Sequence, residues 1–208
     1  ISIITPCYNS SLNLLETYRS ISNQSYSNWE WLVTDDCSSD NTLEMLANFE
    51  KSDSRIKVMS NNFNSGAAVS RNRSLSKVNG EYIAFIDSDD TWHPYKLEKQ
   101  FKFMELHKIA FSFTAYDLID DKGKPLNKIF DFLNSDYFSY EDMLRKKATM
   151  ACSTVMLKTN SFTELKMPLL RTGQDYATWL RLLKPGINAY LLKEVLTSYR
   201  IRKNSISR

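Results

Sequence analysis

Short runs of β-branched and aromatic residues alternate with longer runs of helical periodicity in the first half of this chain. The short runs have the length of single strands, and they are residues 2–5, 29–34, 56–60 and 82–86. Between the first two runs, Leu12, Leu15 and Tyr18 recur at the spacing of one helix face. Strands that alternate with helices in this way build a parallel sheet. The pattern therefore predicts an α/β fold with a mostly parallel sheet flanked by helices.

The alternation ends after a charged helix that we expect at residues 95–107. Residues 109–119 then have the pattern of a strand, which turns at Asp121-Lys122-Gly123 into a hairpin. The elements that we expect beyond the hairpin are a strand at 153–158, a helix at 175–184, and strands near Ala189 and Thr197. The second half of the chain is therefore predicted to be mixed α+β.

Length and composition are those of one globular domain. The chain has 208 residues, of which 42% are hydrophobic and 25% charged, and these values exclude a disordered chain. No apolar run approaches the roughly 18 residues of a membrane span. Because no repeat or low-complexity linker separates the halves, we expect a single domain, 1–208, with halves at 1–108 and 109–208.

Cysteine and histidine are too sparse for a disulfide framework or a zinc site. The chain has three cysteines, Cys7, Cys37 and Cys152, without a Cys-x-x-Cys pair, and two histidines. This usage fits a reducing compartment. We therefore expect a cytoplasmic protein whose contact with the inner face of the cell membrane is at most peripheral.

Basic residues are concentrated towards the C-terminal end. From Lys158 onward there are ten Lys and Arg residues against three acidic residues, although the net charge of the chain is only +3. Such a surface is either a solvated face or a contact for an anionic partner, such as a phosphorylated ligand or lipid headgroups. The overall charge is too small to indicate nucleic acid, and we expect no nucleic-acid partner.

Polar or acidic segments follow each of the four expected parallel strands. They are Pro6-Cys7-Tyr8-Asn9, Asp35-Asp36, Asn64-Ser65-Gly66 and Asp87-Ser88-Asp89-Asp90. Ligands of open parallel sheets bind beyond the carboxyl ends of the strands. We therefore expect these segments to form one site.

The acidic residues and Arg71 describe a pocket for a phosphorylated ligand held through a divalent cation. Asp87 and Asp89 offer the hard oxygen ligands that Mg²⁺ and Mn²⁺ prefer. Neither a Gly-x-Gly-x-x-Gly segment after the first strand nor a Walker lysine is present, which argues against a dinucleotide fingerprint and a P-loop. Asp35 and Asp36 have an alternative interpretation, in which they only form a turn and cap the next helix.

The same segments resemble, in order and spacing, the family-2 inverting glycosyltransferases of the GT-A fold, of the type that builds bacterial surface polysaccharides. The resemblance covers nearly the whole chain. It rests on residues 6–9, 33–40, 64–66, 70–72, 85–90, 174–176, 179–181, 199–200 and 204–207. It implies a Rossmann-like half that binds a nucleotide-sugar and a second half that faces the acceptor.

The resemblance assigns the first part of the site to the nucleotide. Pro6 and Tyr8 would line the pocket of the base, and Asp36 would accept a hydrogen bond from a uracil ring. Arg71 would lie near the base and the phosphates. The implied donor is a nucleotide-diphosphate sugar, with UDP-sugar favoured.

The resemblance assigns the remaining residues to the metal and to catalysis. Asp87 would lie towards the ribose, and Asp89 would bind the Mn²⁺ or Mg²⁺ that bridges the diphosphate. Asp175 would be the general base. Apart from the resemblance, Asp90 is the next candidate if Asp175 proves not to be the base. Relatives often carry an acidic residue at the position of Gln174 and histidine at the position of Arg202.

The reaction implied by the resemblance is the inverting transfer of a hexosyl or N-acetylhexosaminyl group to a hydroxyl of a glycan or a lipid-linked acceptor. Two alternatives remain open. A nucleotide-sugar-binding protein without turnover is suggested by Gln174 and Arg202. A phosphatase of the haloacid-dehalogenase type is suggested by Asp87-Ser88-Asp89-Asp90-Thr91, which fits its Asp-x-Asp-x-Thr nucleophile loop.

Overall fold

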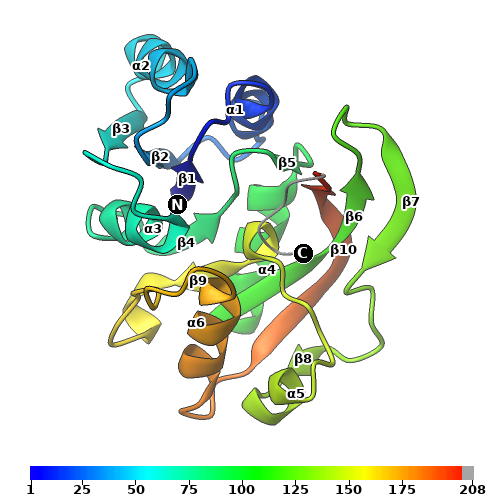
Figure 1. The fold of residues 1–208 in the computed structure, drawn as a ribbon. Coiled ribbons are helices and arrows are strands. Elements are labelled where there is room, and N and C mark those ends of the chain that lie inside the picture. Colours follow the sequence, from blue (N-terminus) through cyan, green and yellow to red (C-terminus); the bar gives the residue numbers. More distant parts are fainter. Residues whose placement is uncertain (203–208) are drawn as a thin grey trace.

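The computed structural model describes residues 1–202 and contains a single ten-stranded sheet (Figure 1). The elements of the first half are β1 (Ser2–Cys7), α1 (Leu14–Ser22), β2 (Glu30–Asp35), α2 (Thr42–Ser52), β3 (Ile56–Ser60), α3 (Ala67–Leu75) and β4 (Tyr82–Phe85). The four strands pair in parallel, in the order β3-β2-β1-β4. The α/β architecture predicted for this half is confirmed.

The second half extends the same sheet with strands of both directions. Its elements are β5 (Thr91–Trp92), α4 (Lys96–His107), β6 (Phe111–Ile119), β7 (Pro125–Phe130), β8 (Tyr137–Phe138), α5 (Tyr140–Leu144), the 3-10 turn η1 (Cys152–Thr154), β9 (Met156–Lys158), the 3-10 turn η2 (Thr159–Ser161), α6 (Gln174–Leu183) and β10 (Ala189–Arg200). Strand β9 pairs antiparallel with β4 on one side and with β6 on the other. Strands β6 and β10 are parallel, so this half is mixed, as predicted.

Two expectations about strands in the second half are wrong. The strands expected near Ala189 and Thr197 are one continuous strand, β10, whose register against β6 shifts on either side of Val195. Such irregularities let a strand bend without ending. The strand expected from Ser153 begins only at Met156, because Ser153 belongs to the turn η1.

Side chains of alternate residues in the central strands enter two separate cores. Ile3 and Trp31 lie on the face that α1, α2 and α4 cover. Their neighbours Ile4 and Leu32 lie on the opposite face, which α3 and α6 cover. All four side chains are fully buried. The continuous apolar runs of the sequence thus reflect strands that are covered on both faces.

The sheet is continuous from the first half into the second, because β9 and β6 follow β4 without a break. We therefore propose that residues 1–208 form one folding unit, with 1–108 and 109–208 as its halves. Within the part that the structure describes, no helix combines the length and the apolar character needed to cross a membrane.

Trp179 packs helix α6 against the sheet. This side chain is fully buried, and its ring meets those of Phe85 in β4 and Phe111 in β6 with centroids 5.5 Å apart in both pairs. Its indole Nε1–H donates a hydrogen bond of 3.1 Å to the carbonyl oxygen of Met150. The first turn of the same helix carries Asp175, so Trp179 also fixes that residue.

We expect Trp179→Ala to lower the free energy of unfolding by about 3–5 kcal/mol, because it opens a cavity between two aromatic rings. Trp179→Phe leaves the Met150 carbonyl unpaired, and its expected cost is smaller, about 1–3 kcal/mol. Leu106→Ala is a control, since Leu106 is 77% exposed in α4; it should change stability by less than about 0.5 kcal/mol. Urea denaturation measures all three. Equal losses for Trp179→Ala and Leu106→Ala would contradict this packing.

Candidate functional site

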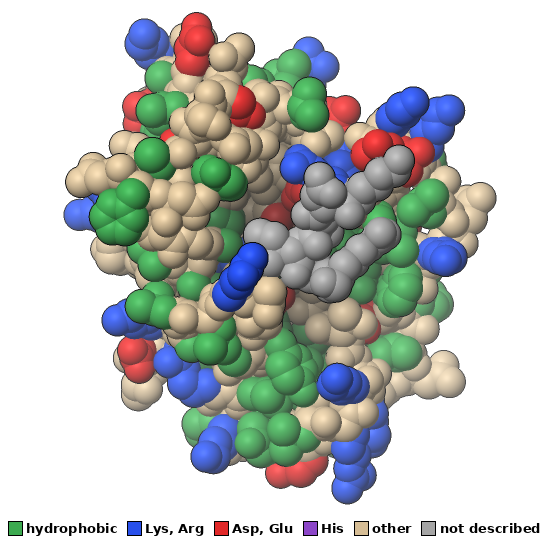
Figure 2. Space-filling view, in the orientation of Figure 1, with side chains coloured by type: hydrophobic (Ala, Val, Ile, Leu, Met, Phe, Trp, Pro, Cys, Tyr) green, Lys and Arg blue, Asp and Glu red, His purple; other side chains and the backbone are tan. Residues whose placement is uncertain are grey.

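Parallel pairing brings the carboxyl ends of β1, β2 and β4 to one edge of the sheet. Cys7 at the end of β1 pairs with Asp35 at the end of β2. The next backbone N–H, of Asp36, donates to the Cys7 carbonyl at 2.7 Å. Asp87 follows β4 on the other side of β1. Figure 2 shows acidic side chains in a hollow near the middle of this view.

Pro6 and Tyr8, the two residues assigned to the base pocket, lie at this edge. Pro6 is the fifth residue of β1, where it is partly buried and pairs with Thr34. Tyr8 follows the strand and is 48% exposed. An exposed ring at a strand end is a suitable surface for stacking on a planar base. Contact with a base remains a prediction for both residues.

Asp36 is almost fully buried and holds the loop between β3 and α3. Its Oδ1 accepts hydrogen bonds from Asn61 Nδ2 at 2.7 Å and from the backbone N–H of Ser65 at 2.9 Å. Its Oδ2 accepts from the N–H of Gly66 at 2.7 Å. Gly66 has a φ of 91°, which a glycine adopts at little cost. Asp36 thus orders the loop that precedes Arg71, and its bond to uracil stays a prediction.

Asp35 forms a turn, as the alternative interpretation of this residue expected. Its carboxylate accepts hydrogen bonds from the hydroxyl of Ser38 at 2.5 Å and from the N–H of Ser38 at 3.1 Å. The side chain is 1% exposed. Asp35 therefore shapes the chain after β2.

Arg71 in α3 is buried and forms an ion pair with Asp87. It is 4% exposed, and its NH2 group forms an ion pair with Asp87 Oδ1. Its Nε and NH1 atoms have no hydrogen-bond partner among the described residues. Burial alone would lower the pKa of Arg71, but the acidic groups of Asp87, Cys152 and Asp175 together raise it above its usual value. The guanidinium therefore stays charged and lies within electrostatic reach of Asp175.

Asp87 and Asp89 form a partly exposed acidic pair. Their side chains are 30% and 26% exposed. Burial, and then the negative charge of Asp87, raise the pKa of Asp89, while Arg202 acts in the opposite direction. Two neighbouring carboxylates favour a positive charge between them.

Arg202 supplies one such charge from the end of the described chain. Its Nε lies 3.0 Å from Asp89 Oδ2, and its NH2 group donates to Asn13 Oδ1 at 2.6 Å. A guanidinium can bind carboxylate or phosphate but cannot ligate a metal. Residues 204–207, which contributed to the resemblance, lie outside the described residues.

Asp90 is a structural carboxylate and is not available as a base. It is 1% exposed, and both of its oxygens accept hydrogen bonds, from Ser153 Oγ at 2.5 Å and from the N–H of Arg200 at 2.9 Å. Burial, followed by the charges of Asp89 and Asp87, raises its pKa well above the usual value. The expectation that Asp90 is the next candidate base is therefore wrong.

Ser153 and Arg200 are the site residues to which sequence reasoning gave no role. The guanidinium of Arg200 is fully buried, donates to the carbonyl oxygen of Asp89 at 2.7 Å, and pairs with Glu16 in α1. Arg200 had a signal, since it belongs to the Tyr-Arg pair of the family resemblance. For Ser153 the only signal is a serine inside an otherwise apolar stretch.

Asp175 lies in the first turn of α6, one residue after the start of the helix. It is partly exposed, and its Oδ1 accepts a hydrogen bond of 2.8 Å from the N–H of Tyr176. The positive end of the helix dipole favours a carboxylate at this place. Cys152 is buried, and burial raises the pKa of its thiol; Arg71 opposes this rise, and Asp87 and Asp175 add to it.

The aromatic residues of the second half divide between core and surface. Tyr116, Phe138 and Trp179 are buried, as core residues would be. Phe132 and Tyr137 are 63% and 49% exposed. Only exposed rings of this kind are available to stack on a sugar.

The carboxylates fit a divalent cation that shares its ligands with a substrate. Among residues 1–202, no group of three or more His, Cys, Asp or Glu side chains is arranged to hold a metal. Asp87 and Asp89 supply carboxylate oxygens, and Mg²⁺ in proteins is commonly bound by one or two carboxylates together with substrate phosphates. The donor set therefore suits a cation that arrives with a diphosphate.

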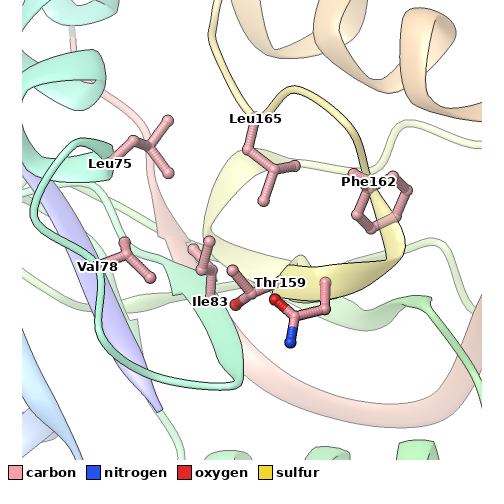
Figure 3. A pocket seen from close by; sticks show the side chains of 7 residues that line it. Leu75, Val78, Ile83, Thr159, Phe162 and Leu165 are labelled. Atoms are coloured by element: carbon pink, nitrogen blue, oxygen red, sulfur yellow. The ribbon is translucent and has the colours of Figure 1, made fainter.

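A separate pocket of about 450 Å³ lies away from these residues (Figure 3). Its lining consists of Leu75, Val78, Ile83, Thr159, Asn160, Phe162 and Leu165. The side chains come from the end of α3, from β4 and from the segment after β9. They are mostly apolar, and none is a predicted site residue.

Comparison with known proteins identifies the family of the chain. Residues 2–164 match the family described as "Glycosyl transferase family 2". The putative teichuronic acid biosynthesis glycosyltransferase TuaG of Bacillus subtilis is 45% identical over 207 residues, which cover 100% of this chain and 81% of TuaG. The Escherichia coli protein WfgD, a UDP-Glc:alpha-D-GlcNAc-diphosphoundecaprenol beta-1,3-glucosyltransferase, is 36% identical over 208 residues, or 100% of this chain and 79% of WfgD.

Solved structures share the fold. The S. aureus TarS 1-349 complex with UDP-GlcNAc superposes with a TM-score of 0.83 at 21% identity, covering 98% of this chain and 59% of that chain. The mannosyltransferase PcManGT of Pyrobaculum calidifontis, in complex with GDP-Man and Mn²⁺, superposes with a TM-score of 0.73 at 16% identity, covering 99% and 58%.

The phosphatase interpretation is wrong. It requires further parallel strands after the Asp87 loop, whereas the strand next to β4 is the antiparallel β9. The order and spacing of the strand-end segments, the sheet, and the match over residues 2–164 agree with one another. The chain belongs to glycosyl transferase family 2 and has the GT-A glycosyltransferase fold.

Proposed function

We propose that this glycosyltransferase moves a hexosyl or N-acetylhexosaminyl group from a UDP-sugar to a hydroxyl of a glycan or lipid-linked acceptor, with inversion at the anomeric carbon. The observation that carries the proposal is the grouping of Arg71, Asp87 and Asp89 at one edge of the sheet, within electrostatic reach of Asp175. This edge offers charge for a diphosphate and a carboxylate for an acceptor proton. The product would enter a cell-surface polysaccharide.

The relatives support the choice of donor and acceptor. WfgD is named for a UDP-Glc donor and a diphosphoundecaprenol-linked acceptor, and TuaG for teichuronic acid biosynthesis. TarS was solved with UDP-GlcNAc. WfgD and TarS thus support a uridine nucleotide, although PcManGT was solved with GDP-Man, and WfgD supports a lipid-linked acceptor.

Donor binding would use the residues at the ends of β1 and β2. The ring of Tyr8 and the side chain of Pro6 offer an apolar wall for a base. The Asp36 carboxylate, already oriented by Ser65 and Gly66, could accept one further bond from uracil N3–H. Arg71, whose Nε and NH1 atoms are buried, would act on the donor phosphates through its positive charge and through its ion pair with Asp87.

Transfer would use charge at the diphosphate and a base at the acceptor. Asp87 and Asp89 would hold a divalent cation, which when bound supplies positive charge to the departing diphosphate. Asp175 would take the proton of the acceptor hydroxyl as its oxygen attacks the anomeric carbon from the face opposite the diphosphate. The hydrogen bond from Tyr176 N–H leaves the other carboxylate oxygen of Asp175 without an assigned partner.

A peripheral contact with the membrane is part of the proposal. Leu169 and Leu170 are 70% and 48% exposed, and the basic residues Lys166 and Arg171 flank them. Exposed leucines beside basic side chains suit an interface with anionic lipids. This segment lies a few residues before Asp175, where a lipid-linked acceptor would be used.

The first prediction concerns the metal. We expect Asp89→Ala or excess chelator to lower transfer by at least about a hundredfold, since the charge supplied to the leaving group contributes several kcal/mol. Asp121→Ala, in the exposed turn between β6 and β7, is the matched control and should leave transfer unchanged. Initial rates with Mn²⁺ and UDP-sugars measure the effect. Full activity in excess chelator would refute metal dependence.

The second prediction concerns the base. Asp175→Asn should slow single-turnover transfer by about 10²- to 10⁴-fold, the contribution of a positioned general base, while the donor dissociation constant stays the same. Glu98→Gln, in the first turn of α4, is the control for loss of a carboxylate at a helix start. Calorimetry and rapid quench separate binding from chemistry. Near wild-type transfer would show that another group is the base, and wild-type protein that binds UDP-sugars without any transfer would favour the binding-only alternative.

The third prediction concerns the membrane. The protein should bind vesicles of phosphatidylcholine and phosphatidylglycerol at low salt, and substituting both leucines (Leu169→Gln with Leu170→Gln) should weaken binding about tenfold, because apolar burial is lost. Leu106→Gln, on the exposed side of α4, should have no effect. Cosedimentation provides the measurement. Equal binding to vesicles of pure phosphatidylcholine, or none to either, would count against the contact.

A further inference from the structure

Ser153, in the other half of the chain, holds the loop that carries Asp87 and Asp89 at two points through its hydroxyl group. Ser153 Oγ accepts a hydrogen bond of 3.0 Å from the backbone N–H of Asp87 and donates one of 2.5 Å to Asp90 Oδ2. Ser153 is 1% exposed, so water does not compete for these bonds. The hydroxyl therefore closes the loop by joining its first and last acidic residues.

The carbonyl oxygen of Ser153 anchors the continuation of the same loop. It accepts a hydrogen bond of 2.7 Å from Nε1 of Trp92 in β5 and one of 3.2 Å from Oγ1 of Thr197 in β10. Trp92 and Thr197 are paired neighbours in the sheet. One residue of η1 thus contacts both ends of the segment from Asp87 to Trp92.

Repulsion among its carboxylates would distort this loop if other residues did not fix its conformation. Asp87, Asp89 and Asp90 are three carboxylates within four residues, and like charges at such spacing repel one another. The N–H of Asp87 lies beyond the end of β4, so the sheet ladder does not fix it. The bond to Ser153 supplies that fixed point, and Ser153 together with the N–H of Arg200 holds the carboxylate of Asp90.

We propose that Ser153 is a positioning residue of the donor site. Its hydroxyl sets the backbone direction at Asp87, and thereby the direction in which Asp87 and Asp89 present their carboxylates to a cation and a diphosphate. The inference rests on the proposed function for the identity of that ligand. Ser153 itself touches neither donor nor acceptor.

The test compares two buried serines. Ser153→Ala removes the hydroxyl that holds the loop, while Ser74→Ala removes a buried hydroxyl that pairs with Thr34 Oγ1 at 2.8 Å in α3 and β2. Both variants should lose comparable stability in urea. Only Ser153→Ala should raise the dissociation constant of UDP with Mn²⁺, by at least about tenfold, as expected when hydrogen bonds involving charged groups are lost.

A kinetic and a structural readout separate positioning from simple destabilisation. In Ser153→Ala the KM for the donor should rise and the KM for the acceptor stay constant, because the hydrogen bonds of Ser153 within residues 1–202 go to Asp87, Asp90, Trp92 and Thr197 and none goes to α6. Ser153→Thr keeps the hydroxyl and should restore most of the donor affinity. The amide hydrogen of Asp87 should exchange at least about tenfold faster in Ser153→Ala and at the wild-type rate in Ser74→Ala.

The binding measurements distinguish failure of the inference from failure of the proposed function. If folded Ser153→Ala binds UDP with Mn²⁺ as wild-type protein does, or if Ser74→Ala weakens binding equally, the inference is overturned while the proposed function stands. If wild-type protein binds no UDP-sugar with Mn²⁺, the proposed function fails and the inference fails with it. Weaker donor binding in Ser153→Ala alone, with rescue by Ser153→Thr, supports the positioning role.

Discussion

The buried carboxylate of Asp90 joins parts of the chain that are far apart in sequence. Its two oxygens accept hydrogen bonds from Ser153 and from the backbone of Arg200, and its carbonyl oxygen accepts one from Thr17 in α1 at 2.8 Å. A polar group so deeply buried is tolerated only when its hydrogen bonds are made. The loop after β4, the end of β10, the turn η1 and α1 are therefore fixed relative to one another, and the site is built on this junction.

Two arginines balance the other two carboxylates of the site. Arg71 approaches Asp87 from the buried side of α3, and Arg202 approaches Asp89 from the end of β10. The first is fully enclosed, whereas Arg202 is about one-third exposed. The Arg71–Asp87 pair is a fixed element of the site, because removing Asp87 would leave the buried guanidinium of Arg71 without its counter-charge. The Arg202–Asp89 pair is weaker, since both of its side chains are partly exposed and solvent screens them, and it involves the carboxylate proposed for the cation.

Much of the fold was open to prediction because its signals are local. The β-branched runs of β1 to β4 and the helical spacing between them are set by neighbouring residues, and the strands occur where the pattern placed them. The single strand β10 was misread as two, because its polar middle interrupts the apolar run while the ladder to β6 continues through register shifts. Asp35 and Asp36 are adjacent in sequence, yet one closes a turn and the other orders the loop before α3. Two neighbouring carboxylates at a strand end cannot be assigned different roles from the sequence, because their roles depend on which loops donate hydrogen bonds to them.

The sequence by itself determined the order of strands and helices and the residues that stand at the strand ends, because periodicity and turn residues act over a few positions. Together with the family resemblance, it also identified the acidic pair and Asp175. Only the tertiary structure decided which of these groups meet: Ser153 binds Asp90 across 63 positions of sequence, and Arg200 binds it across 110. Such contacts depend on the position of β9 between β4 and β6 and of β10 beside β6. A pattern of neighbouring residues carries no information about partners 63 or 110 positions away. The burial of Asp90 and the role of Ser153 therefore become visible only in the assembled sheet.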